Sequence, residues 1–209
     1  MTRVLDAVRR YYSEKIVEHG PTAKGVDWND QASQELRFDQ LLKVCDPSRP
    51  FSLNDYGCGY GALARYLGRR GYTFRYTGFD ISDEMVVKAR ELLRDAENHR
   101  FVGSESELEP ADYTVASGIF NVRLDAADDA WEQHVLETLG RIDALSLKGF
   151  SFNMLTSYSD ADRMRPDLYY ADPRVIFDHC KRTFSRWVAL LHDYGLYEFT
   201  IVVRKEAET

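Results

Sequence analysis

A glycine-rich segment, Asp55-Tyr56-Gly57-Cys58-Gly59-Tyr60-Gly61, limits the folds open to this chain more than any other part of its sequence. The segment follows a short apolar run and opens a helical pattern that contains Leu63, Tyr66 and Leu67. Alternate glycines allow backbone conformations and close ligand approaches that side chains would prevent. In an open α/β sheet, the first strand-to-helix turn lies where ligands bind. The segment therefore predicts a ligand-binding turn in an α/β fold.

From Phe51 onward, short apolar runs alternate with amphipathic helical patterns. The alternation is typical of parallel strands joined by crossover helices. The helices are expected after Gly61, from Ser82 to about Ala96, and over 131–142, and Ser82 is a predicted N-cap. The expected strands are Ser52–Asp55, Arg75–Asp80, Phe101–Val102, Tyr113–Ala116 and Phe150–Leu155.

The two ends of the chain depart from this alternation. Two amphipathic helices are predicted before the first strand, over about 4–16 and 30–45, and Gly20-Pro21 ends the first of them. After a helix capped by Asp172-Pro173, the runs 187–191 and 197–203 flank a short Asp/Gly turn, which predicts a hairpin. We therefore expect a Rossmann-like, mostly parallel seven-stranded sheet with helices on both faces, a C-terminal antiparallel hairpin strand and an N-terminal helical extension.

Composition favours a small-molecule partner. The 209 residues suit one domain, and a net charge of −7 disfavours nucleic acid and anionic membranes as partners. Cys45, Cys58 and Cys180 lack the spacing of a disulfide framework or zinc site, and we expect no metal. The N-terminal stretch lacks the apolar core of a signal peptide, and no run reaches the length of a membrane span. A cytoplasmic protein is expected.

Two ligand classes fit the glycine segment. Gly57-x-Gly59-x-x-Ala62, followed by Asp80 after the next strand, also satisfies the dinucleotide fingerprint. In both classes Asp80 would accept hydrogen bonds from ribose hydroxyls. Asp55, however, would repel a pyrophosphate and attract an ammonium group, which favours an amino-acid-bearing nucleoside.

In its acidic residue, its alternate glycines and its reversed final strand, the sequence resembles the class I S-adenosylmethionine-dependent methyltransferases. The resemblance implies S-adenosylmethionine as cofactor, with Asp55 and Gly57 near its methionine portion and Asp80 at its ribose. Ile81 and Met85 would pack on the adenine, although both also suit an ordinary core. The remaining cofactor-binding candidates that the resemblance implies are Cys58, Gly59, Gly61, Ser104, Ser117, Gly118, Trp28 as a lid residue, and Arg37 near the cofactor's carboxylate.

The acceptor site is expected at the end of the fourth strand and in the segment after the fifth. Asn121 could orient an acceptor, and His192 is the best-placed histidine for a general base, with His134 and His179 expected to be structural or exposed. The substrate-binding candidates are Arg123, Tyr158, Tyr169 and Tyr170. The alternative for these residues is a turn, a solvated charge or a packed surface loop.

We therefore predict a single methyltransferase domain over 1–209 that methylates an oxygen or nitrogen of a small metabolite. Within it, 1–48 would be a helical lid, 50–155 the cofactor-binding core, 156–185 an acceptor-site insertion and 186–205 the terminal hairpin. An NAD(P)-dependent oxidoreductase and a non-catalytic S-adenosylmethionine-binding protein stay open as alternatives. The sequence predicts no oligomeric state.

Overall fold

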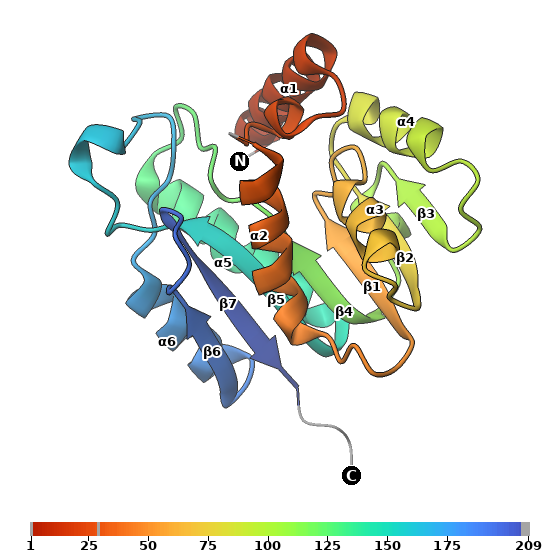
Figure 1. Ribbon diagram of the computed structural model, residues 1–209. Helices are drawn as coiled ribbons and strands as arrows, with labels where there is room; N and C mark the ends of the chain where they lie inside the picture. The colour runs from red at the N-terminus through yellow and green to blue at the C-terminus, as the bar shows by residue number, and fades with distance from the viewer. Residues whose placement is uncertain (1, 29, 206–209) are drawn as a thin grey trace.

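The computed structural model describes residues 2–28 and 30–205, and its centre is a seven-stranded sheet in the order β3-β2-β1-β4-β5-β7-β6 (Figure 1). Only β7 runs against its neighbours β5 and β6, and the other pairings are parallel. The predicted sheet and its reversed hairpin strand are confirmed. The strands are β1 Phe51–Tyr56, β2 Phe74–Phe79, β3 His99–Val102, β4 Ala111–Ala116, β5 Ser146–Leu155, β6 Trp187–Leu191 and β7 Glu198–Arg204.

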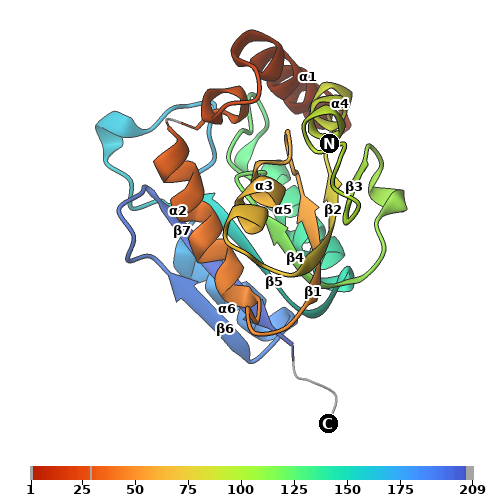
Figure 2. The ribbon, with the colours of Figure 1, turned by 45° about the vertical axis from the view of Figure 1, so that its right-hand side comes forward.

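Helices cover both faces of the sheet (Figure 2). Side chains alternate along β5, so Phe150 and Phe152 join one core cluster whereas Ser151 faces α2 and donates a hydrogen bond to the Leu41 carbonyl. The first cluster packs on α5 and α6, and a second cluster packs on α2, α3 and α4. The helices are α1 Thr2–His19, α2 Gln31–Leu41, α3 Ala62–Arg69, α4 Asp83–Leu92, α5 Asp128–Ala144 and α6 Pro173–Thr183.

Local chemistry fixes where several helices begin and end. The predicted caps are confirmed: Ser82 accepts a hydrogen bond from the Met85 N–H, and Asp172 accepts one from the N–H of Arg174, next to Pro173. The structure corrects two boundaries. Helix α4 ends at Leu92 rather than Ala96, where Leu93 leaves helical geometry, and β5 begins at Ser146, ahead of the apolar run from which it was predicted.

Helix α1 lies across the edge of the sheet at which the parallel strands end (Figure 1). It contacts α4, and Ser13 of α1 shares a hydrogen bond with Ser82 at the start of α4. Val8 is buried in the first core cluster and Ile16 against Tyr60 and Met85. The helix therefore covers the glycine-rich turn after β1. None of the described helices combines the length and apolarity needed to cross a membrane.

Candidate active site

The glycine-rich turn is held in place by the strand beside it. The N–H groups of Gly57 and Cys58 both donate to the Phe79 carbonyl, at 2.7 and 2.9 Å. Asp80, the next residue, accepts from the Gly59 N–H at 2.8 Å and from the Ser82 N–H at 2.9 Å. Asp80 therefore shapes the turn itself, which the sequence did not reveal.

Gly57 and Gly59 are required by both backbone conformation and space. Their φ angles are +83° and +54°, values that favour glycine. A Cβ on Gly57 would lie 2.3 Å from Ile119 Cγ2, and one on Gly59 would lie 3.0 Å from Val26 Cγ1. These two glycines keep open the floor of a cavity beneath α1.

Gly61 has a different role from the one predicted. Its φ of +81° starts α3, but a Cβ there would lie 2.8 Å from Leu93 and 3.1 Å from Phe101, on the side of β3 and α4. It is absent from the cavity wall. The third glycine is thus explained by packing between elements.

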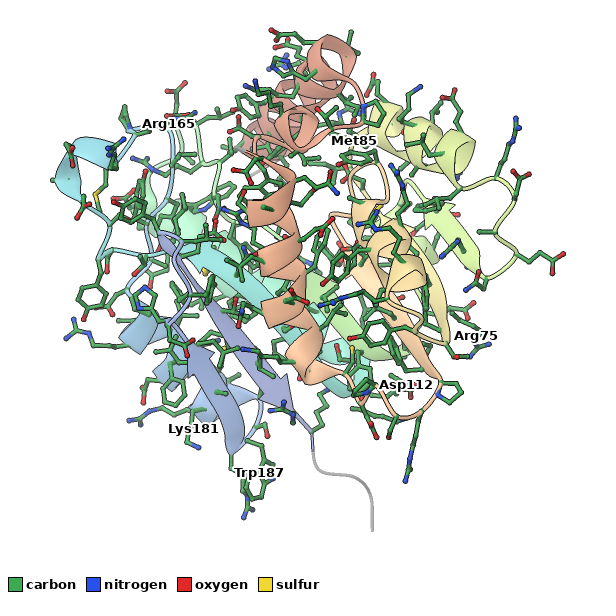
Figure 3. All side chains as sticks on the ribbon, viewed as in Figure 1. Arg75, Met85, Asp112, Arg165, Lys181 and Trp187 are labelled. Atoms are coloured by element: carbon green, nitrogen blue, oxygen red, sulfur yellow. The ribbon has the colours of Figure 1, made fainter. Side chains whose placement is uncertain are left out.

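The cavity above the turn, here called the apolar cavity, lies between α1, the sheet edge and α5. Met85, labelled in Figure 3 beside α4, belongs to its wall and is almost fully buried. The wall brings together the predicted residues Trp28, Asp55, Gly57, Cys58, Gly59, Asp80, Ile81, Met85, Ser117 and Gly118, and adds Leu5, Val8, Tyr12, Val26, Gln34, Phe38, Tyr56, Tyr60, Ala62, Leu63, Phe79, Glu105, Ile119, Trp131, His134, Thr138 and Arg141.

Two carboxyl groups in this wall carry perturbed pKa values. Burial raises the pKa of Asp55 to about 7; the hydrogen bond that Tyr76 donates at 2.5 Å opposes the shift, and the Asp80 carboxylate adds to it. Burial raises the pKa of Asp80 to about 6, against the hydrogen bonds from Ser82 and Gly59. A bound cation would stabilise the ionised forms of these two buried carboxyl groups, whereas a pyrophosphate would destabilise them. The cavity is suited to a ligand that carries positive charge.

A second cavity, here called the polar cavity, shares Tyr12, Val26 and Trp28 with the first. Asn121 and Tyr170, both predicted at the acceptor site, are part of its wall. Its other lining residues are Asp27, Arg37, Val122, Leu155, Ser159, Arg163, Arg165, Leu168, Tyr197 and Glu198. Trp28 contacts Gly118 closely: a Cβ on that glycine would lie 2.4 Å from the indole ring. Trp28 therefore stands where the two cavities meet.

Arg37, Glu198 and Asn153 form a buried polar network next to Trp28. The Arg37 guanidinium lies 3.8 Å from the centre of the Trp28 ring and pairs with Glu198, donating from Nε at 2.7 Å. Glu198 also accepts from Asn153 Nδ2, and Asn153 Oδ1 accepts from the Gly118 N–H at 2.8 Å. The network ties Trp28 to β7, β5 and the turn after β4. Arg37, predicted near the cofactor, lines the polar cavity and not the apolar one.

Several other predicted residues lie outside both cavities. Ser104 is exposed and bonds to the Ser106 hydroxyl, whereas its neighbour Glu105 reaches the apolar cavity. Arg123 donates to the Leu168 and Ala126 carbonyls and so braces a loop.

The remaining three predicted residues outside the cavities, Tyr158, Tyr169 and His192, are aromatic. Tyr158 is 61% exposed and contacts His192. His192 is itself exposed and follows β6, which is separated from β4 by two strands, β5 and β7. Tyr169 packs against the first core cluster. The structure thus gives none of these three a place in either cavity wall.

Reasoning from the sequence also missed residues that the site contains. Glu198 and Asn153 are polar residues within strands that are otherwise largely apolar, which was the available signal. Trp131 and Thr138 of α5 also line the apolar cavity, and no local pattern in the sequence indicates that α5 reaches it.

Comparisons with known proteins agree with this geometry. A family model described as a methyltransferase domain matches residues 54–142. The chain is also 56% identical over 164 residues to Rv1506c of Mycobacterium tuberculosis, which is named as a methyltransferase; the match covers 78% of this chain and 99% of that protein. The chain belongs to the class I S-adenosylmethionine-dependent methyltransferases. With this family membership the dinucleotide alternative falls. Solved methyltransferases of the same fold hold S-adenosylmethionine or S-adenosylhomocysteine.

Solved structures show the same fold. Human N-acetylserotonin methyltransferase in complex with S-adenosylmethionine superposes with a TM-score of 0.65 at 20% identity, covering 98% of this methyltransferase and 59% of that chain. The N-methyltransferase NodS from Bradyrhizobium japonicum WM9, with S-adenosylhomocysteine, gives 0.62 at 14% identity and covers 86% and 90%.

Proposed function

We propose that this methyltransferase transfers a methyl group to an oxygen or nitrogen of a small cytoplasmic metabolite. The observation that carries the proposal is the pair of adjoining cavities: one is apolar and holds the glycine turn, and the other is polar and meets it at Trp28 and Gly118. A donor in the first cavity and an acceptor in the second would face each other at that junction.

The apolar cavity fits the donor. Asp80, at the end of β2, would accept from the ribose hydroxyls, and Asp55 would attract the ammonium group of the methionine portion. Ile81 and Met85 would pack on the adenine. Glu105 and the Ser117 hydroxyl, whose buried oxygen has no hydrogen-bond partner among the described residues, are further polar groups in the wall.

The polar cavity would receive and orient the acceptor. When bound, the cofactor supplies a sulfonium methyl carbon that an oxygen or nitrogen nucleophile attacks as the carbon–sulfur bond breaks. The protein's part is alignment and exclusion of water. Asn121 is placed for this task, because its Oδ1 already accepts from the Leu155 N–H and its Nδ2 lies 3.6 Å from the point where a Gly118 Cβ would be.

The experiment is acceptor profiling with S-adenosylmethionine that carries a deuterated methyl group. The purified enzyme is incubated with a fractionated cell extract, and mass spectrometry identifies labelled compounds. We expect label on an oxygen or nitrogen of a small molecule, and its loss with Asp80→Asn, whose single amide oxygen can serve only one of the two N–H groups, of Gly59 and Ser82, that Asp80 accepts from. Label confined to carbon, protein or nucleic acid would contradict the proposal.

A further inference from the structure

Arg37 has a hydrogen-bond donor that the protein leaves unused. The residue is 6% exposed, and two of its nitrogens, Nε and Nη2, donate to Glu198 Oε1. Its third nitrogen, Nη1, is buried and has no hydrogen-bond partner in the described part of the chain. An unsatisfied buried donor of a charged group costs roughly as much as a lost hydrogen bond or more, so such atoms call for a partner.

Glu198 does not accept from Nη1. Its Oε1 accepts both Arg37 donors, and its Oε2 accepts from Asn153 Nδ2. The flat face of the Arg37 guanidinium is covered by Trp28. The edge that bears Nη1 is therefore the part of the group left for a ligand, and Arg37 belongs to the wall of the polar cavity.

Two further guanidinium groups line the same cavity from the segment between β5 and α6. Arg163 and Arg165 are 69% and 49% exposed; Arg163 pairs with Asp162, and Arg165 pairs with Asp167 and also lies 3.8 Å from Asp27. Figure 3 labels Arg165 on this outlying loop. Exposed ion pairs between neighbours contribute little stability. Both arginines can thus attract an anion to the cavity mouth.

We propose that the methyl acceptor carries a carboxylate, which binds Arg37 Nη1 in the polar cavity. This proposal rests on the function proposed above and adds the substrate class. A guanidinium N–H bonds a carboxylate oxygen more strongly than a neutral one, because the bond is charge-assisted. With its carboxylate at Arg37, behind the Trp28 ring, the acceptor would present its nucleophile toward Gly118 and the junction of the cavities. Arg37 is thus a specificity-determining residue.

The test titrates three probes by calorimetry into the full-length enzyme saturated with S-adenosylhomocysteine. Benzoate is the carboxylate, benzamide its neutral counterpart and phenyl phosphate the alternative oxyanion. We expect benzoate to bind at least about tenfold more tightly than benzamide and phenyl phosphate. Arg37→Lys keeps a positive charge beside Glu198 but removes Nη1, and should weaken benzoate at least about fivefold while S-adenosylhomocysteine binds as before.

Two further variants control the measurement. Arg163→Gln, at the cavity mouth, should weaken benzoate by about twofold to threefold, and Arg182→Gln, an exposed residue of α6, should leave it unchanged. Equal binding of benzoate and benzamide, tighter binding of phenyl phosphate, or an unchanged benzoate affinity in Arg37→Lys would overturn the proposal. So would weaker S-adenosylhomocysteine binding in that variant, which would assign Arg37 to the cofactor. Failure of the wild type to bind S-adenosylhomocysteine would count instead against the proposed function, and the probes are then titrated without it.

Discussion

Asp55 is a buried side chain whose charge the apolar cavity controls. Burial raises its folded pKa to about 7, above the ordinary value of 3.8. A carboxyl group whose pKa is raised by folding contributes stability that is full below about pH 4 and is lost as the pH rises through about 7. The same ionisation creates the negative charge that an ammonium group would bind.

Above about pH 7, Asp55→Asn should therefore raise the stability of the ligand-free protein and lower its affinity for S-adenosylhomocysteine. At pH 8 we expect the free energy of unfolding of the ligand-free variant to exceed that of the wild type by about 1 kcal/mol or more, and the difference to vanish near pH 4. S-adenosylhomocysteine affinity should rise more steeply between pH 5.5 and 7.5 in the wild type, where Asp55 and Asp80 both ionise, than in the variant, where only Asp80 does. Circular dichroism and calorimetry measure the two profiles.

Asp178→Asn, an exposed change on α6, is the control and should alter neither profile. Parallel pH dependence of stability in Asp55→Asn and the wild type would show that Asp55 is ionised normally in the folded protein.

Residues far apart in the chain limited what sequence could predict of the site. Asp55, Gly57, Gly59 and Asp80 lie within one strand-turn-helix-strand unit, whose spacing alone predicts their proximity. Arg37 and Glu198 are 161 positions apart, and their pairing depends on where α2 crosses β7. No local pattern carries that information.

Among the elements, α1 and the segment between β5 and α6 are joined through Asp27. Asp27 accepts a hydrogen bond from Tyr11 at 2.8 Å and pairs with Lys15 at 3.2 Å, both on α1, and Arg165 lies 3.8 Å from it. It adopts a left-handed backbone conformation with φ of +60°. Asp27 therefore adds to the Ser13–Ser82 hydrogen bond and to the apolar contacts of Val8 and Ile16 in holding α1 over the apolar cavity.

Asp27→Asn tests this fastening, because asparagine tolerates the left-handed conformation but lacks the charge. We expect amide hydrogen exchange in α1 to quicken by about threefold to tenfold while the strands are unaffected, since ends and lids open without global unfolding. Asp6→Asn, an exposed change on the same helix, is the matched control. Equal exchange in both variants would show that Asp27 does not help to hold α1.

The elements themselves were predicted well where apolar runs were clean. β1, β2 and β4 match their predicted positions closely, as do the caps at Ser82 and Asp172. β5 was predicted too short because its first residues, Ser146-Leu147-Lys148, lack an apolar run. The polar cavity could not be foreseen, since it forms where the α1–α2 connection meets a loop more than 100 residues later.

At the scale of the whole molecule, the proposed function requires that the cofactor bind in the apolar cavity. Gly59 forms part of its floor, with φ of +54°, and a side chain there would meet Val26 and Met85. Gly71 has a similar φ of +74° but open space around its Cβ position. Valine at either position brings comparable backbone strain, of about 1 to 2 kcal/mol, but only Gly59→Val intrudes on the cavity.

Calorimetric titration of S-adenosylhomocysteine into the wild type, Gly59→Val and Gly71→Val tests the cofactor site most directly. We expect one molecule to bind per wild-type chain. The affinity of Gly71→Val should be within about twofold of the wild-type affinity, whereas that of Gly59→Val should be at least about tenfold weaker, or about 1.4 kcal/mol. Circular dichroism confirms that each variant is folded. Wild-type affinity in a folded Gly59→Val would contradict the account and place the cofactor elsewhere.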